Sequence, residues 1–183
     1  MVDNKIIKSI KTDFFALRNG EIADRLRKAG SPYKIIFGLQ IPQLNGIASK
    51  FEPSAELAET LWDNRSTRES RLLATMVYPV EEFTVDMAEK WSSEADTVEL
   101  ADMLCFRLVR YIEGAEALVE KKIESDKEAD RYFALRLAMN LLVMGKLKDV
   151  GAVYSMAQRA YSSAAAKTVA AQIIEEIDFI NEK

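Results

Sequence analysis

An aspartate, Asp102, lies within the largely apolar stretch TVELADMLC, which covers residues 97–105. A carboxylate held at a fixed position stabilises positive charge that develops during a reaction. The same residue also has an ordinary explanation, because a negative charge near the N-terminus of a helix interacts favourably with the helix dipole. From these residues alone, Asp102 is either an ordinary residue at the solvent edge of a helix or part of a functional site.

The residue types that are missing exclude several kinds of chemistry. The 183-residue chain has no histidine and one cysteine, so it cannot build a Cys/His zinc site or a histidine-dependent nucleophile by itself. It also lacks the glycine-rich phosphate loops GxxxxGK[ST] and GxGxxG. Acid–base or electrostatic chemistry would therefore depend on carboxylate, lysine, tyrosine or arginine side chains, and we expect no metal.

The same composition indicates a cytoplasmic protein. A lone cysteine cannot cross-link the fold, which fits a reducing compartment. The longest apolar runs, such as residues 141–144, are only a few residues long, so we expect no membrane-spanning helix. The sequence MVDNKIIKSIK at the N-terminus has no apolar segment of signal-peptide length.

Charge is distributed unevenly along the chain, whose net charge is −4. Residues 1–50 hold nine Lys/Arg against four Asp/Glu, residues 51–130 hold nine against twenty, and residues 131–183 hold seven against five. Basic surface for a nucleic acid would have to come from the two ends, which flank an acidic middle. The alternative is that these charges are ordinary solvated helix faces.

The elements that must position Asp102 are predicted to be helices. Apolar residues recur with helical spacing almost throughout. We expect the segment YKIIFGLQIPQL to be an extended loop that leads into a helix at Pro42, because a single short strand would have no partner. Ser66, Thr67 and Glu69 resemble an N-cap and capping turn. The expected helices cover residues 4–17, 21–28, 42–51, 53–62, 66–78, 83–91, 97–112, 114–123, 128–145, 149–161 and 164–181.

Successive helices joined by short turns form either a bundle or a helical-repeat solenoid. Arg71, Arg107 and Arg136 each open an apolar run, at intervals of about 30 to 36 residues, which is near the period of two-helix repeats. We therefore predict an all-α, HEAT-like helical-repeat solenoid that forms a single domain over residues 1–183.

Several motifs resemble the DNA alkylation repair family of HEAT-like alkylpurine DNA glycosylases. The resemblance covers roughly residues 30–145 and includes a Gly-hydrophobic-x-x-Pro turn, a Leu-Trp pair, an Arg/Leu/Ala-rich helix and a later helix that carries an aspartate. The residues that match these motifs are Gly38, Leu39, Pro42, Leu61, Trp62, Glu69, Arg71, Leu72, Ala74 and Asp102.

This resemblance implies a solenoid face that holds a DNA duplex and an activity that removes cationic methylated purines without a cofactor or metal. It implies that Asp102 is the catalytic carboxylate and that Arg136, which is 34 residues later, contacts DNA beside it. Basic residues near the N-terminus would contact phosphates, namely Lys5, Lys8, Arg25, Arg27 and Lys34.

The chain departs from the family where aromatic residues are expected. The resemblance places tryptophans at Val98 and Ala171, and a tyrosine near Ala29, where Tyr33 is the closest aromatic residue. These losses favour an alternative hypothesis: a catalytically inactive HEAT-like scaffold that binds nucleic acid or a protein partner.

Overall fold

The fold is described from a computed structural model, for residues 2–147, 149–160 and 166–182. In these ranges every regular element is helical, and the one β-bridge is an isolated contact between Ile35 and Thr67. The chain divides into two compact units, Met1–Glu82 and Phe83–Lys183, which are described separately. The single domain over residues 1–183 stays a prediction.

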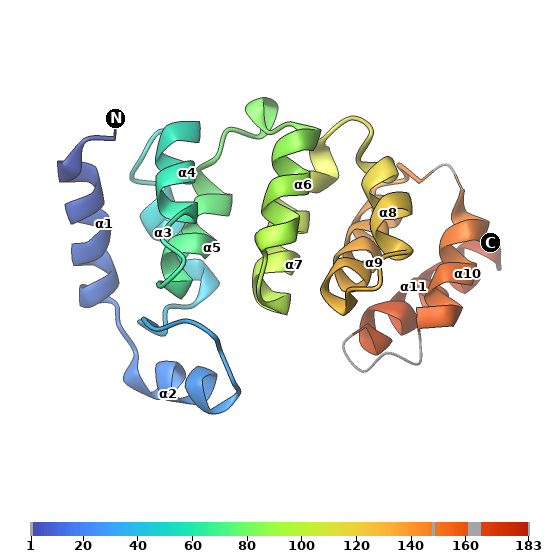
Figure 1. The fold of residues 1–183 in the computed structure, drawn as a ribbon, viewed down its shortest axis with the longest axis horizontal. Helices are drawn as coiled ribbons and strands as arrows, with labels where there is room; N and C mark the ends of the chain where they lie inside the picture. The colour runs from blue at the N-terminus through green and yellow to red at the C-terminus, as the bar shows by residue number, and fades with distance from the viewer. Residues whose placement is uncertain (1, 148, 161–165, 183) are drawn as a thin grey trace. The chain divides into compact units, whose positions relative to one another are not determined.

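The first unit consists of short helices, and three of them start at a side-chain cap. The side chains of Asp3, Asn19 and Ser54 each accept a hydrogen bond from a backbone N–H in the first turn, which satisfies donors that the helix itself leaves unpaired. The helices are α1 (Asn4–Ala16), α2 (Gly20–Lys28), α3 (Ile41–Ala48), α4 (Ala55–Trp62), α5 (Arg68–Val77) and the 3-10 helix η1 (Val80–Glu82) (Figure 1).

The loop between α2 and α3 is held by a buried carboxylate. We expected Glu69 to belong to a capping turn, but its carboxylate instead accepts hydrogen bonds from the backbone N–H groups of Phe37, Gly38 and Leu39, at 3.0, 2.9 and 3.3 Å. Thr67 does occupy the N-cap of α5, without a side-chain cap bond. The predicted loop is therefore confirmed, and the carboxylate at the start of α5 stabilises it because buried N–H groups need acceptors.

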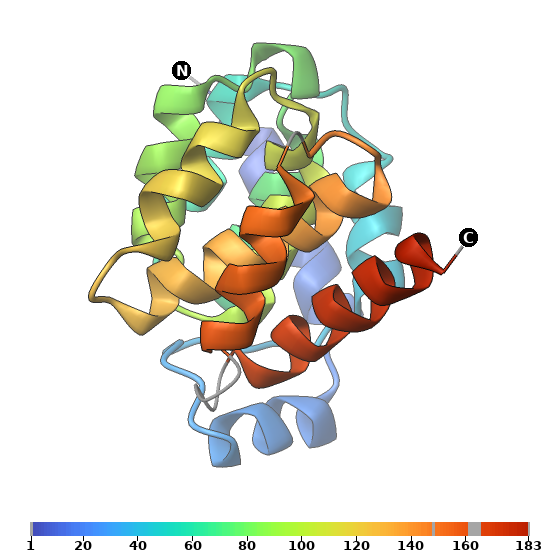
Figure 2. The same cartoon turned by 90° about the vertical axis from the view of Figure 1, so that its right-hand side faces the viewer.

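The second unit is built from helix pairs that pack in two layers, with α6, α8 and α10 in one and α7, α9 and α11 in the other (Figure 1). Figure 2 shows the pair α10 and α11, in orange and red, nearest the viewer. The elements are α6 (Val85–Glu94), α7 (Val98–Arg107), the 3-10 helix η2 (Val109–Tyr111), α8 (Ala115–Ile123), α9 (Glu128–Val143), α10 (Val150–Ala160) and α11 (Lys167–Asn181).

The predicted helices agree closely with the observed ones, with one interruption. The helix expected over residues 97–112 ends at Arg107, and residues 109–111 form η2 after a break at Leu108. Helices α10 and α11 were both expected; residues 161, 164 and 165 of the expected helices lie outside the described part of the chain.

Each unit has its own apolar core. Trp62 in the first unit and Trp91 in the second are fully buried, as is Cys105. Burial and the negative charge of Asp102 raise the pKa of the Cys105 thiol well above its ordinary value, which makes this cysteine an inert small hydrophobe rather than a nucleophile. In the described ranges, no helix is long and apolar enough to cross a membrane.

Candidate functional site around Asp102

Asp102 lies on an exposed stripe of α7. The side chain of Thr97 caps this helix by accepting the N–H of Leu100 at 3.2 Å. Val98, Asp102 and Phe106 follow at intervals of four residues, a spacing that places side chains on one face of a helix. Val98 and Phe106 are about half exposed, so the carboxylate lies between two apolar side chains that solvent reaches.

Two residues of α9 hold the Asp102 carboxylate. Arg136 Nε and the hydroxyl of Tyr132 both donate to Asp102 Oδ1 at 2.7 Å, and Arg136 Nη2 donates to the Tyr132 oxygen at 3.3 Å. The Asp102 side chain is 37% exposed and that of Arg136 is 24% exposed. The three side chains therefore form a closed network with the carboxylate at its solvent edge.

The network changes the acid–base properties of its members. Burial, together with the hydrogen bond to Asp102, raises the pKa of Tyr132 to about 12, so the phenol stays a hydrogen-bond donor at neutral pH. Partial burial lowers the pKa of a guanidinium, but here the hydrogen bond with Tyr132 and the charge of Asp102 outweigh it, and the pKa of Arg136 is raised. Both residues therefore act as fixed donors to the carboxylate.

An aromatic and arginine cluster follows Asp102 along the chain. The guanidinium of Arg110 lies 3.8 Å from the centre of the Phe106 ring, a cation–π contact. Arg110 Nη2 also donates to the hydroxyl of Tyr111 at 2.6 Å. Phe106, Arg110 and Tyr111 therefore form an ordered surface group beside the Asp102 network.

Sequence reasoning missed Tyr132 and Phe106 as members of the site. A local signal was present: Phe106 is four residues after Asp102, and Tyr132 is four residues before Arg136. On helices, residues at this spacing are neighbours. The spacing could have nominated both residues, although it does not tell which way either helix faces.

The predicted site residues divide between the two units. Asp102 and Arg136 are brought together in the second unit, whereas the five predicted phosphate contacts all belong to the first. All five are exposed, but Arg27 is already engaged, because Nη1 pairs with Asp24 at 2.8 Å and Nη2 donates to the carbonyl of Ile36 at 3.3 Å. The other four are Lys5, Lys8, Arg25 and Lys34, and their role stays a prediction.

Tyr33, the aromatic residue closest to the position where the resemblance places a tyrosine, is not accessible to a nucleotide. Tyr33 is buried, in a small cluster with Ala23 and Ile36, so its ring offers no open face to a nucleotide. Val98 is exposed but aliphatic, and Ala171 on α11 is only partly exposed. None of these three positions supplies the aromatic wall that the resemblance implies.

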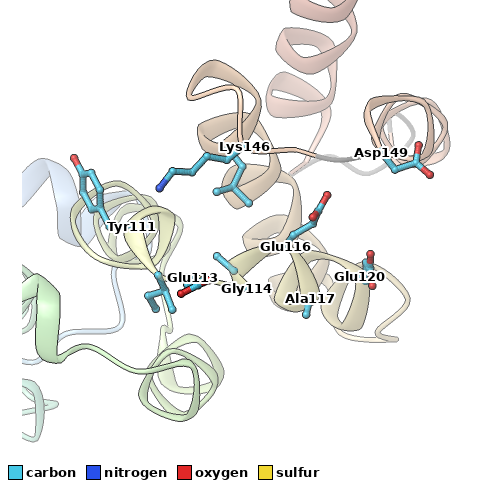
Figure 3. Close-up of a pocket in the computed structure, with 11 residues that line it drawn as sticks. Tyr111, Glu113, Gly114, Glu116, Ala117, Glu120, Lys146 and Asp149 are labelled. Atoms are coloured by element: carbon cyan, nitrogen blue, oxygen red, sulfur yellow. The ribbon is translucent and has the colours of Figure 1, made fainter.

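A separate cavity of the second unit is lined by several acidic side chains. It has a volume of about 620 Å³ and lies beside η2, α8 and the start of α10. Figure 3 shows Glu113, Glu116, Glu120 and Asp149 around it, with Lys146. Phosphate groups would be repelled here. Another cavity lies beside Arg136 and is lined by residues of α7, η2, α9 and α11. The two cavities share no lining residue.

The geometry of the site does not resemble a metal centre. Within the described residues, no three acidic or cysteine side chains are grouped as metal ligands would be. The site instead combines one carboxylate, two fixed donors and an aromatic–guanidinium cluster.

Comparison with solved structures defines the class of fold. A structure from a family of proteins related to the HEAT-like repeat DNA glycosylases, with affinity for branched DNA structures, superimposes with a TM-score of 0.77. The match covers 93% of this chain and 74% of that chain, at 15% sequence identity. The fold is therefore the predicted all-α, HEAT-like repeat fold.

The sequence of the chain then gives the family. The model of the DNA alkylation repair enzyme family matches residues 10–166. The chain belongs to this family, as the motifs around Gly38, Trp62 and Asp102 indicated. No curated protein matches the chain.

Proposed function

We propose that this protein binds DNA through the layer formed by α7, α9 and α11, with Asp102 and Arg136 at the contact surface. The observation that carries the proposal is the network itself: a carboxylate and an arginine, 34 residues apart in sequence, meet at a solvent edge through a 2.7 Å hydrogen bond. In a member of the DNA alkylation repair enzyme family, the ligand expected at such an edge is DNA.

The charge of the chain implies how such binding would behave. Arg136 retains donors beyond those used on Asp102 and Tyr132, and phosphate oxygens are good acceptors for them. The exposed basic residues of the first 50 positions, which carry nine Lys/Arg against four Asp/Glu, would add phosphate contacts. Because the whole chain has a net charge of −4, the affinity should be modest and fall steeply with salt.

The test is fluorescence anisotropy with a labelled DNA duplex and a labelled four-way junction, over a series of salt concentrations. Arg136→Gln should weaken binding about tenfold, since it removes a positive charge from the contact surface and frees Asp102 to repel phosphate. Arg159→Gln is the matched control, because Arg159 lies on α10 and pairs with Glu124 at 3.3 Å. Absence of DNA binding even at low salt would favour the alternative, a scaffold for a protein partner.

The exposed carboxylate favours a second candidate function, alkylpurine DNA glycosylase activity. When the bond between a cationic alkylated purine and its sugar breaks, the base leaves neutral and positive charge develops on the sugar. A carboxylate fixed by Tyr132 and Arg136 could stabilise that charge until water adds to the sugar. Duplex DNA is the substrate that this reaction would require.

Positioning argues against strong catalysis at this site. Val98 stands one helical turn before Asp102, where the resemblance implies an aromatic wall, and much of catalysis depends on holding the reacting groups in place. We therefore expect release of 7-methylguanine from alkylated duplex DNA to stay at background, in the wild type as in Asp102→Asn. Release by the wild type that Asp102→Asn abolishes would establish the enzyme instead.

A further inference from the structure

A second cavity of the same unit lies directly beside the Asp102 network. It has a volume of about 440 Å³, within the range of roughly 300–1,000 Å³ usual for small-molecule sites. Arg136 lines it and also holds Asp102, so a ligand in the cavity would be next to the carboxylate. The lining residues that matter for its chemistry are Phe106, Arg110, Arg136, Asn140, Glu175 and Glu176.

One wall of the cavity offers a flat surface suited to stacking. Phe106 is 47% exposed, and the Arg110 guanidinium lies over its ring at 3.8 Å. The hydrogen bond from Arg110 to the Tyr111 hydroxyl keeps the guanidinium in place. Aromatic rings and guanidinium planes are the side chains on which unpaired bases stack.

The polar groups of the lining match the edge of a base better than a phosphate. Arg110, Arg136 and Asn140 line the cavity with side chains that can donate hydrogen bonds. Glu175 and Glu176 on α11 supply acceptors in the same cavity. A base edge carries both donors and acceptors, whereas a phosphate carries acceptors only and would be repelled by two carboxylates.

We propose that this cavity holds one unpaired nucleobase of a DNA strand, stacked against Phe106 and Arg110, with its edge toward Asn140, Glu175 and Glu176. This inference rests on the DNA binding proposed above, and it adds which kind of DNA the protein prefers. A paired base cannot enter, because its faces are stacked and its edge is engaged with its partner. The preferred DNA is therefore one with an unpaired nucleotide, as in a bulge or at a branch.

The experiment compares two DNA duplexes of the same sequence, one fully paired and one with a single bulged 2-aminopurine. The wild type should bind the bulged duplex about tenfold more tightly and quench the 2-aminopurine fluorescence, as expected for one stacked base. Phe106→Leu keeps an apolar side chain but removes the ring, so it should abolish both the preference and the quenching.

Phe179→Leu is the matched control, because Phe179 is an exposed aromatic residue of α11 that does not line the cavity. It should keep the preference and the quenching. Equal affinity for the two duplexes, or a preference that survives Phe106→Leu, would overturn the cavity assignment while leaving DNA binding intact. Absence of binding to either duplex would overturn the proposed function and this inference together.

The free 2-aminopurine deoxynucleotide distinguishes a nucleotide in a strand from a free one. If the strand is the source, quenching of the free nucleotide should require at least a hundredfold higher protein concentration than quenching of the bulged duplex. Quenching at equal protein concentrations would show that the cavity serves a free nucleotide, and would overturn the assignment to DNA.

Discussion

The hydroxyl of Tyr132 donates to Oδ1 of Asp102 at 2.7 Å, and this links α9 to α7 at the exposed edge of the candidate site. The same carboxylate oxygen accepts a hydrogen bond from Arg136 Nε, so two residues of α9 hold the carboxylate of Asp102. The orientation of Asp102 is therefore fixed by its partners on α9 rather than by its own helix.

This relationship predicts a measurable coupling between Tyr132 and Asp102. Tyr132→Phe should lower the free energy of unfolding by about 1 kcal/mol, because it removes the hydroxyl that donates to Asp102 and accepts from Arg136 Nη2, while the carboxylate keeps its bond from Arg136 Nε. In a double-mutant cycle with Asp102→Ala, which removes the acceptor, the coupling free energy should also be about 1 kcal/mol. Urea denaturation measures each variant.

The control for the cycle is Tyr111→Phe, which removes a phenol hydroxyl at an exposed residue and should change stability by less than about 0.5 kcal/mol. A coupling of zero between Tyr132 and Asp102 would mean that their hydrogen bond is absent in solution.

The buried pair of Arg68 and Glu69 should be essential for the first unit. Glu69 Oε1 accepts from Arg68 Nη1 at 2.8 Å, and both side chains are almost completely buried. Glu69→Gln removes the buried negative charge that Arg68 Nη1 contacts and replaces one acceptor oxygen with a donor amide. We expect a loss of about 3–5 kcal/mol in the free energy of unfolding.

Glu52→Gln provides the comparison, since Glu52 is exposed and its substitution should be nearly neutral. If the two variants unfold at the same denaturant concentration, the buried carboxylate does not hold the loop at Phe37, Gly38 and Leu39.

Two glycines with similar backbone angles should respond differently to alanine. Gly38 (φ +80°) would place a Cβ atom 2.2 Å from the carbonyl oxygen of Asn19, whereas Gly30 (φ +86°) has nothing within 4 Å of that position. Gly30→Ala should cost only the left-handed backbone strain, about 1–2 kcal/mol. Gly38→Ala adds a backbone clash and should cost clearly more, as thermal unfolding of both variants would reveal. Equal losses would contradict the close approach of the loop to α2.

The acid stability of the second unit should depend on Asp130. Burial alone raises the pKa of a carboxyl, but hydrogen bonds from Lys122 and Ser125 and nearby positive charges outweigh it here, and the pKa of Asp130 is lowered from 3.8. A lowered folded-state pKa contributes stability that is present above about pH 4 and is lost as the pH falls through the folded value. Asp130→Asn should therefore destabilise the protein at pH 7 but progressively less below pH 4.

Denaturant titrations at several pH values give this comparison. Asp126→Asn serves as the control, because Asp126 is exposed and its substitution should change the free energy of unfolding by less than about 0.5 kcal/mol. A penalty for Asp130→Asn that is the same at pH 7 and pH 3 would contradict the role of the Lys122 ion pair, whose atoms are 2.6 Å apart.

The sequence by itself determined the helices, because the spacing of apolar residues and the caps are local. The expected helix over residues 128–145 is observed as α9, Glu128–Val143, and the caps at Ser54 and Thr97 form as polar residues before apolar runs should. The break at Leu108 was not predicted, because the apolar period continues through it.

The sequence also nominated Asp102 and Arg136 through motifs, but only the tertiary structure decided how they meet. Their contact depends on the packing of α7 against α9 and on the rotation of each helix about its axis, and no local pattern fixes either. The same packing gave Asp102 its second partner, Tyr132, and placed Phe106 beside Arg136 at one cavity.

Glu69 illustrates the same division within the first unit. Its position three residues after Ser66 is a local capping signal, yet its carboxylate binds backbone groups 30 to 32 residues earlier in the chain. Those N–H groups donate to the Glu69 carboxylate because they are buried in the loop and need an acceptor. Local sequence patterns therefore predict which helices form. The partners of a buried charge depend on which groups the tertiary structure brings within hydrogen-bonding distance.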